Sequence, residues 1–494
     1  MYLGIDIGTS GVKAILLDGD DRVIAEANAS LSVQRPRPLW SEQEPDAWWQ
    51  ATNDAVGALR EQAPREFAAL RAVGLSGQMH GATLLDVRDR PLRPAILWND
   101  GRSAAECVAL EHAVPDSRRI TGNRAMPGFT APKVLWVREH EPEVFARTAR
   151  VLLPKDYVRL CMTGDHATDL SDASGTLWLD VAGRRWAEPM LAACGLGLAA
   201  MPSLHEGPEP TGRLRAEVAQ QWGCERVPVV AGGGDNAAGA VGVGVVRPGR
   251  AFISLGTSGV YFVAGDAFRP DAERAVHAFC HALPGQWHQM SVLLSAASCL
   301  SWVTKLTAAR DESALLDEMA AADAPSSRLL FLPYLSGERT PHNDPNATGV
   351  FIGLDHETGR AQLGRAVLEG VAFAFADAER VLREAGSVID RVSVIGGGAR
   401  SRFWGRILAS ALDRPLHYQQ AGEIGPARGA ARLARLGTSD DSLADCCSEG
   451  PDDFVAEPER ALVDFYAGRI ERFHSLYPAL RETFRGDADT SQEN

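Results

Sequence analysis

Short apolar runs, broken by glycine and hydroxyl residues, open the chain. Residues 2–7 and 12–17 are mainly apolar and are separated by the tetrapeptide GTSG at residues 8–11. A third apolar run, residues 23–25, follows the turn sequence DGDD. Runs of this length between turn residues are typical of strands. The pattern therefore predicts a meander of three strands whose first turn is rich in glycine and hydroxyl groups.

The same pattern occurs a second time in the chain. Residues 5–12 read IDIGTSGV and residues 253–260 read ISLGTSGV, so six positions of eight are identical. Long-range self-similarity indicates a repeated structural unit, and chance similarity in a glycine-rich chain is the alternative. We therefore predict two duplicated domains. Asp6 has a carboxylate where Ser254 has a hydroxyl, which fits a metal-linked role for the first copy and a phosphate-binding role for the second.

A chain break precedes the second copy. Residues 246–249 read VRPG, so we predict an N-terminal domain of residues 1–246 and a C-terminal domain of residues 247–480. Apolar residues recur every three to four positions in residues 44–61 and 362–385, which predicts a long helix in each half. The chain is polar from Arg485 onward, so residues 481–494 are expected to form a disordered tail.

A strand that ends in glycines carries the first candidate catalytic residue. Apolar residues 227–231 lead into GGGDN at residues 232–236, and a stretch of small residues, 237–246, is a predicted helix. Glycines let a ligand approach the backbone, and ligands of α/β folds collect where strands give way to helices. Asp235 is placed there to accept a proton from a substrate hydroxyl as a general base. The alternative is an N-cap aspartate behind a tight turn.

Two further segments carry candidate binding groups. Residues 74–81 (GLSGQMHG) and 97–102 (LWNDGR) bring amide, imidazole, carboxylate and guanidinium groups near an aromatic side chain, as a polyol site requires. For His80 alone, a turn histidine is the alternative interpretation. Residues 394–401 (VIGGGARS) form a third strand that ends in glycines before a predicted helix at residues 403–412. Such a helix N-terminus can bind a nucleotide or another anion, and a plain turn is the alternative.

Charge and missing motifs exclude several functional classes. The net charge is −14 and no basic stripe is present, so no nucleic-acid partner is expected. No run of 18 apolar residues and no signal peptide occur, so a cytoplasmic protein without a membrane partner is predicted. The eight cysteines are scattered and form no CxxC pair, which favours free thiols.

Known nucleotide-binding motifs are also missing. The absence of GxxxxGK[ST] excludes a P-loop kinase. Residues 232–237 fit GxGxxA loosely, but no acidic residue follows about 20 positions on, which counts against a dinucleotide-dependent dehydrogenase.

Two long segments resemble the signature patterns of the FGGY carbohydrate kinases. Residues 128–137 (GFTAPKVLWV) resemble the first pattern, and residues 349–354 (GVFIGL) with 362–369 (QLGRAVLE) resemble the second. The resemblance extends from Tyr2 to about Tyr477. It implies an α/β protein with the duplicated actin-like (ribonuclease H-like) ATPase fold, with two domains around a central cleft. It also implies that the protein uses ATP and Mg²⁺.

The resemblance implies a role for each candidate residue. Asp235 would be the catalytic base, and Asp6 would act with Mg²⁺. The sugar substrate would contact Gln78, Met79, His80, Trp98 and Asn236. The nucleotide would contact Thr9, Gly256, Thr257, Gly397, Gly398 and Ala399.

Three segments indicate which sugar the protein is expected to phosphorylate. Residues 78–81, 97–102 and 153–157 (LPKDY) resemble family members that transfer the γ-phosphate of ATP to the C5 hydroxyl of D-xylulose, giving D-xylulose 5-phosphate. D-ribulose, L-xylulose or a pentitol are alternative substrates, and a non-catalytic sugar-binding regulator is the alternative from another class. Arg428 departs from the pattern, because these relatives usually have an apolar residue there. Family members are often dimers, so a homodimer is also an expectation from the resemblance.

Overall fold

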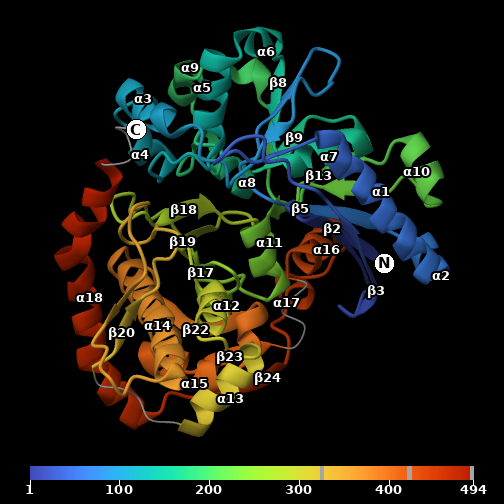
Figure 1. Cartoon of the computed structure of the whole chain (residues 1–494). Helices are drawn as coiled ribbons and strands as arrows, with labels where there is room; N and C mark the ends of the chain where they lie inside the picture. Colours follow the sequence, from blue (N-terminus) through green and yellow to red (C-terminus); the bar gives the residue numbers. More distant parts are fainter. Residues whose placement is uncertain (323–327, 420–424, 490–494) are drawn as a thin grey trace.

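The computed structural model describes residues 1–322, 328–419 and 425–489. Two mixed β-sheets, one from each half of the chain, are covered by helices and lie on either side of the molecular centre (Figure 1).

The first sheet comes from the N-terminal half. Its main strands, in spatial order, are β3 (Val23–Ser30), β2 (Gly11–Leu17), β1 (Tyr2–Ile7), β5 (Ala72–Gly77), β14 (Pro228–Val230) and β13 (Pro210–Arg213). Strands β1, β2 and β3 are antiparallel neighbours, whereas β1, β5 and β14 run parallel. The short strand β15 (Gly233–Gly234) also pairs with β5.

The second sheet repeats this order. It contains β18 (His277–Cys280), β19 (Trp287–Leu293), β17 (Gly259–Gly265), β16 (Gly249–Leu255), β22 (Ile389–Ile395), β23 (Leu416–Gln419) and β24 (Asp452–Ala456). Strands β16, β17 and β19 are antiparallel, β16, β22 and β23 are parallel, and β24 is an antiparallel edge strand, as β13 is in the first sheet. The predicted duplication and the actin-like fold are therefore confirmed.

The strongest periodic patterns gave the correct helices. Residues 44–61 form α1 (Pro45–Gln62), and residues 362–385 form α14 (Arg360–Glu384). The predicted helix at residues 403–412 is α15 (Arg402–Leu412). The prediction for residues 237–246 was wrong in its bounds, because α11 (Asp235–Gly242) begins at Asp235 itself and ends earlier.

The expected tail differs from the structure over most of its length. Helix α18 (Arg460–Asp489) extends into the segment predicted to be disordered, as far as Asp489. Phe484 is buried in the apolar core of the second half, and Tyr477, on the same helix, donates its hydroxyl to Asp344 at 2.8 Å, so this part of the helix is packed against the protein. Residues 490–494 of the predicted tail lie outside the described residues.

Alternation along β1 determines which way Asp6 faces. Leu3, Ile5 and Ile7 belong to an apolar core with α1 and α7 (Pro154–Thr163). Tyr2 packs on the opposite face, with residues of α11 and of α16 (Gly425–Thr438). Successive side chains of a strand point to opposite faces, so Asp6 lies on the same face as Tyr2.

Helix α16 comes from the C-terminal half but packs against the first sheet and α11 (Figure 1). The approach is so close that a Cβ at Gly429 would overlap the carbonyl oxygen of Ala238 in α11. A Cβ at Gly4 in β1 would likewise overlap the carbonyl oxygen of Ala427 in α16. Backbone-to-backbone packing of α16 therefore joins the two halves. The predicted boundary at residue 246 separates the two sheets but does not describe the position of this helix.

Within the described ranges, no helix combines the length and the apolar character that crossing a membrane requires.

The close packing of α16 predicts the effect of adding one methyl group. Gly429→Ala should lower the free energy of unfolding by about 1–3 kcal/mol, because the new Cβ overlaps backbone that cannot move aside easily. Gly57→Ala is the matched control, since Gly57 lies in α1 and its Cβ would meet no atom within 4 Å. The control should be neutral or stabilising by up to about 1 kcal/mol. Denaturant unfolding of both variants tests this, and equal stability of Gly429→Ala and the parent would contradict the packing argument.

Candidate active site

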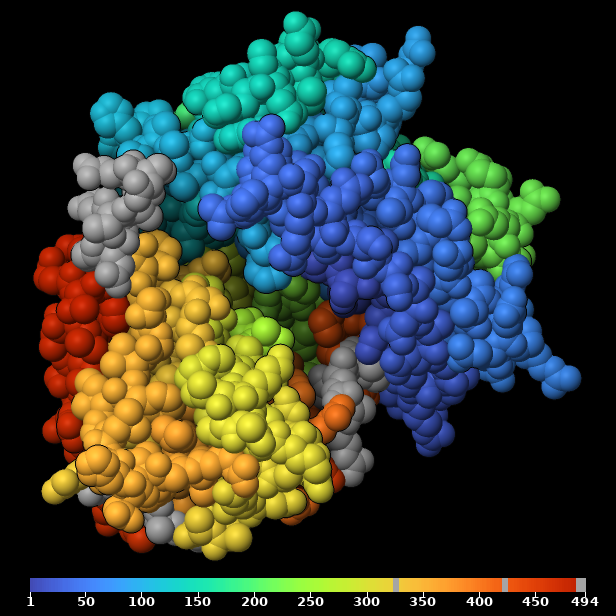
Figure 2. Space-filling view, in the orientation of Figure 1, coloured from blue at the N-terminus to red at the C-terminus, as the bar shows by residue number. Residues whose placement is uncertain are grey.

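A cavity of about 370 Å³ lies where the two halves meet. It is lined by Asp235, Asn236 and Gly239 of α11, Phe252 and Ser254 of β16, Ile395 at the end of β22 with Gly396 and Gly397 after it, and Pro426 of α16. The space-filling view shows a hollow between the blue N-terminal half and the yellow and orange C-terminal half (Figure 2). The cavity therefore draws its walls from both copies of the repeat.

Asp235 is the first residue of α11, and the N-cap is Gly234. The alternative interpretation of Asp235 as an N-cap is therefore wrong. The backbone N–H and the side-chain amide of Asn236 donate to Oδ1 of Asp235 at 2.7 and 2.9 Å. All the hydrogen bonds that Asp235 accepts from described residues end on Oδ1, which leaves Oδ2 for a ligand.

Two carboxylates interact electrostatically at this site. Burial, reinforced by the negative charge of Asp6, raises the pKa of Asp235 to about 7, while the hydrogen bonds from Asn236 oppose the shift. Burial also raises the pKa of Asp6 to about 6, against the effects of Ser76 and Lys13. Carboxyl groups with strongly raised pKa values in a cavity are a feature of functional sites.

The segment 78–81 packs directly beneath the glycines that precede Asp235. A Cβ at Gly234 would lie 2.9 Å from Cγ of Met79, so Met79 contacts the backbone next to the candidate base. His80 has a positive φ of 72° and its Nδ1 lies 2.7 Å from the carbonyl oxygen of Gly175. A carbonyl only accepts, so Nδ1 carries the proton.

The protonation state of His80 follows from its surroundings. Burial, together with the charge of Lys133, lowers the pKa of His80 to about 3, so the ring is neutral near pH 7. With the proton on Nδ1, the Nε2 atom has a free lone pair. Neutral His80 can therefore accept a hydrogen bond from a ligand hydroxyl at Nε2.

A chain of hydrogen bonds joins Trp98, Thr9 and Gln78. Nε1 of Trp98 donates to Oγ1 of Thr9, which in turn donates to Oε1 of Gln78, both at 3.0 Å. Nε2 of Gln78 donates to Gln43 at 2.9 Å, and Gln78 is only 2% exposed. These contacts place Thr9, expected at the nucleotide, beside the residues expected at the sugar. They also commit the amide of Gln78 to protein partners, whereas 42% of the Trp98 surface is exposed.

Apart from Thr9, the residues expected at the nucleotide lie on the second half. Gly397 lines the cavity together with Asp235. Gly398 and Ala399 continue the short helix η2 (Gly397–Arg400). Gly256 and Thr257 form the turn between β16 and β17, and their carbonyl oxygens accept from the backbone N–H groups of Ala297 and Ala296 at 2.7 and 2.9 Å. This turn is thereby fixed to the start of α12 (Ala297–Leu306).

Arg428 is bound away from the cavity. Its guanidinium pairs with Asp21 in the turn between β2 and β3, and Arg432 donates to the same carboxylate at 2.7 and 3.0 Å. The neighbouring Pro426 lines the cavity instead. Arg428, which departs from the pattern of the relatives, therefore helps to join α16 to the first sheet.

Sequence reasoning missed several residues of the cavity wall. Phe252 and Ser254 alternate with the core residues Ile253 and Leu255 along β16, and the alternation turns them toward the cavity. Ser254 occupies the position equivalent to Asp6, and the repeat had already singled it out, whereas Phe252, two positions earlier on the same face, was missed. Gly239 and Pro426 are cavity residues because α11 and α16 cross there, a contact that no local pattern reveals.

Both halves of the chain match a known protein family. Residues 1–242 match the N-terminal domain of the FGGY family of carbohydrate kinases, and residues 251–437 match its C-terminal domain. The chain is 55% identical to the xylulose kinase of Escherichia coli (strain K12) over 97% of its length and 99% of that protein. It is 52% identical to the xylulose kinase of Klebsiella pneumoniae, over 97% of its length and 99% of that protein.

A solved structure agrees with the sequence comparisons. The crystal structure of a "xyloylose kinase" from Brucella ovis is 51% identical, has a TM-score of 0.95, and covers 98% of this chain and 99% of its own. The two family models match the two halves of the chain, and the sequence relatives cover nearly all of it. This protein therefore belongs to the FGGY family of carbohydrate kinases.

Proposed function

We propose that this protein transfers the γ-phosphate of ATP to the C5 hydroxyl of D-xylulose, giving D-xylulose 5-phosphate. The observation that carries the proposal is the position of Asp235 at the cavity between the two halves, with Oδ1 held by Asn236 and Oδ2 left for a substrate hydroxyl. The named activity of the Escherichia coli and Klebsiella relatives, at more than half identity, supports the choice of sugar.

Asp235 is proposed as the general base. Its Oδ2 takes the proton of the sugar hydroxyl while the hydroxyl oxygen forms a bond to the γ-phosphorus and the bond from that phosphorus to ADP breaks. Phosphoryl transfer depends mainly on positioning and charge stabilisation, so the base must be held still. The two hydrogen bonds from Asn236 supply that orientation.

The sugar is proposed to bind between the Met79–His80 segment and Trp98. Neutral His80 offers Nε2 as an acceptor for a sugar hydroxyl, and the exposed ring of Trp98 offers an apolar face to the C–H edge of the sugar. Thr9 and Gln78 act as positioning residues, because their hydrogen bonds fix the indole of Trp98.

Asp6 is proposed to hold Mg²⁺, through water. Within the part of the chain that the structure describes, its buried Oδ1 has no hydrogen-bond partner, which fits an oxygen that a hydrated cation would complete. When bound, Mg²⁺ supplies positive charge against the phosphates of ATP. Gly397 and its neighbours Gly398 and Ala399 are proposed to contact the nucleotide. Gly256 and Thr257 are proposed to face its phosphates.

The remaining expectations concern organisation and location. All eight cysteines are free thiols, which supports a proposed location in the reducing cytoplasm. The domain boundary near residue 246 and the homodimer stay predictions.

A panel of acceptors tests the function directly. ADP release should be measured with D-xylulose, D-ribulose, L-xylulose, xylitol and glycerol, and D-xylulose should give the highest kcat/KM. A higher value for another pentulose or for the pentitol would overturn the choice of substrate and keep the kinase mechanism. No sugar-stimulated ADP release would overturn the catalytic proposal and favour the sugar-binding regulator.

Replacing the base tests the role of Asp235. Asp235→Asn keeps the shape of the side chain but removes the basic oxygen, so kcat should fall by about 10²–10⁴-fold, the scale of general-base catalysis. Asp54→Asn, at an exposed position of α1, is the matched control and should keep full activity. Steady-state kinetics with D-xylulose compares them, and near-normal turnover of Asp235→Asn with an unchanged thermal melt would remove Asp235 from the mechanism.

Metal titration tests the role of Asp6. Asp6→Asn should raise the Mg²⁺ concentration needed for half-maximal activity by about 10–100-fold, the usual effect of losing an outer metal partner. The measurement is activity against Mg²⁺ at saturating sugar, with Asp54→Asn again as the control. A titration curve identical to that of the parent would show that Asp6 does not act with the metal.

A further inference from the structure

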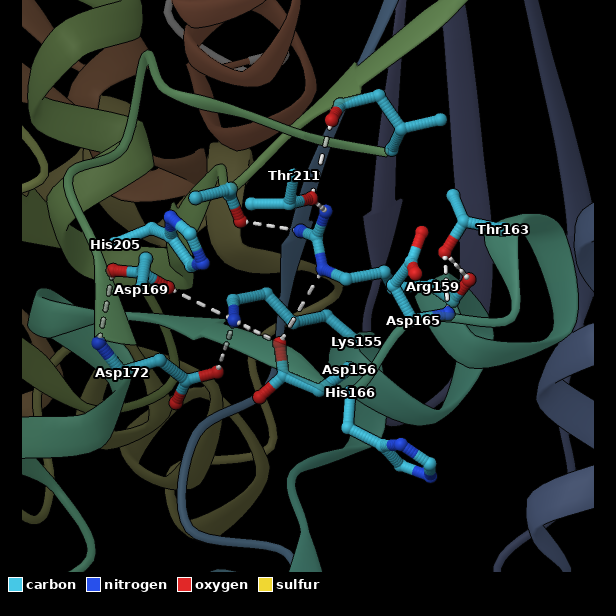
Figure 3. A network of polar contacts seen from close by, with 12 residues as sticks. Lys155, Asp156, Arg159, Thr163, Asp165, His166, Asp169, Asp172, His205 and Thr211 are labelled. Atoms are coloured by element: carbon cyan, nitrogen blue, oxygen red, sulfur yellow. Dashed lines mark hydrogen bonds and ion pairs between the residues drawn. The ribbon is translucent and has the colours of Figure 1, made fainter. Parts of the chain in front are cut away.

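A cluster of buried charges lies beneath the candidate active site. Nζ of Lys155 lies 2.5 Å from Asp156, 2.9 Å from Asp169 and 3.2 Å from Asp172 (Figure 3). Arg159 lies one turn along α7, and the side chains of all five residues are fully buried. We call these five residues the Lys155 cluster.

The cluster holds the short helix α8 (Leu170–Ser174) by its first residues. Asp169 is the N-cap, and its Oδ2 accepts from the backbone N–H groups of Ser171 and Asp172 at 2.7 and 3.2 Å. The hydroxyl of Ser171 donates to the same oxygen. Asp169 thus gives one carboxylate oxygen to Lys155 and the other to α8.

Both ends of α8 reach the candidate active site. At its start, Oγ of Ser171 accepts from the backbone N–H of Gly234 at 3.1 Å, directly before Asp235. The Ser171 hydroxyl proton is already given to Asp169, so its lone pairs are free to accept from Gly234. Just after α8 ends, the carbonyl of Gly175 accepts from Nδ1 of His80 at 2.7 Å. One short helix therefore contacts both the loop of the base and the sugar-binding histidine.

Arg159 fixes the strand that leads into the same loop. Its guanidinium donates to the carbonyl oxygens of Val230 at 2.9 Å and of Ala231 at 2.5 Å. Val230 ends β14 and Ala231 follows it, directly before the glycines at residues 232–234. The Lys155 cluster thus contacts the Asp235 loop from the strand side as well as from α8.

Stability alone does not explain the cluster. Burying ionised groups is costly, and well-packed apolar residues are often as good or better for stability. Burial raises the pKa of Asp172 well above its usual range, despite Lys155, so the cluster favours a proton on Asp172. Burial also raises the pKa of Asp156, against the opposing charges of Lys155 and Arg159. A fully buried network of ion pairs and hydrogen bonds offers fixed geometry, which is what a loop carrying a general base requires.

We propose that the Lys155 cluster and α8 form a positioning device, in which Ser171 fixes the loop of Asp235 and Gly175 fixes His80 relative to it. The inference deepens the proposed function and rests on it, because it takes Asp235 as the base and His80 as a sugar contact. Ser171 and Lys155 are positioning residues, since both act through other groups.

Removing one hydroxyl tests the device. Ser171→Ala should reduce kcat for D-xylulose by about 10–100-fold, the scale of a small misplacement of reacting groups, with the KM for ATP unchanged. Ser410→Ala in α15 is the matched control: its buried hydroxyl likewise accepts from a backbone N–H, that of Glu459 at 3.0 Å, and makes no contact with α8 or the Asp235 loop among the described hydrogen bonds. The control should lower the melting temperature but keep kcat. Equal kcat values for Ser171→Ala and the parent would overturn the proposal.

A second variant covers the case in which Ser171→Ala does not fold. Asp169→Asn keeps an oxygen that caps α8 but removes the charge that pairs with Lys155. It should also lower kcat for D-xylulose by about 10-fold or more while the KM for ATP stays unchanged. An unchanged kcat in this variant would likewise overturn the proposal.

A double-mutant cycle separates this inference from the proposed function. If Ser171 acts through Asp235, Ser171→Ala should cause no further loss of kcat in the Asp235→Asn background. The same fold loss in both backgrounds would overturn the positioning role alone and leave Asp235 as the base. Near-normal turnover of Asp235→Asn by itself would overturn the proposed function, and the positioning role with it.

Discussion

The contact between α11 and α16 is the constraint on which the site depends. Helix α11 begins with Asp235 and belongs to the first half, whereas α16 comes from the second half and packs on β1 and β5. Glycines at the crossing let backbone meet backbone, as at Gly429 against Ala238. The cavity lies beside this crossing, with Gly239 of α11 and Pro426 of α16 both in its wall. A wider separation of the two helices would separate the base from the glycines after β22.

Two electrostatic arrangements with different consequences lie on either side of the Asp235 loop. On the cavity side, desolvation raises the pKa values of Asp6 and Asp235 to about 6 and 7, although Lys13 opposes the shift of Asp6. On the protein side, Lys155 and Arg159 pair with the buried carboxylates of the Lys155 cluster and hold them in place. The loop is therefore fixed by hydrogen bonds on its protein side, whereas the carboxylates on its cavity side remain available to a cation. That combination suits a site that must bind a metal-bound triphosphate and move one proton.

The sequence predicted the parts of this protein that repeat or alternate. The ISLGTSGV copy of IDIGTSGV predicted the duplicated sheets, and periodicity predicted α1 and α14 within two residues. Asp235 was identifiable because GGGD follows an apolar strand. The positions that were not predicted depend on contacts between distant segments. Trp98 donates a hydrogen bond to Thr9, although the two residues are 89 positions apart. The backbone N–H of Gly234 donates to the hydroxyl of Ser171, which lies 63 positions earlier in the chain. The extension of α18 depends on burial of Phe484, which the polar composition of the tail concealed.

The central claim is that Asp235 Oδ2 receives the proton of the sugar hydroxyl that is phosphorylated. A crystal structure with D-xylulose and a non-hydrolysable ATP analogue tests it most directly. The account predicts the C5 hydroxyl oxygen within hydrogen-bond reach of Oδ2, about 2.6–3.2 Å, on the side of Asp235 that faces the γ-phosphate. A sugar bound with its C5 hydroxyl away from Asp235, with both substrates in place, would contradict it.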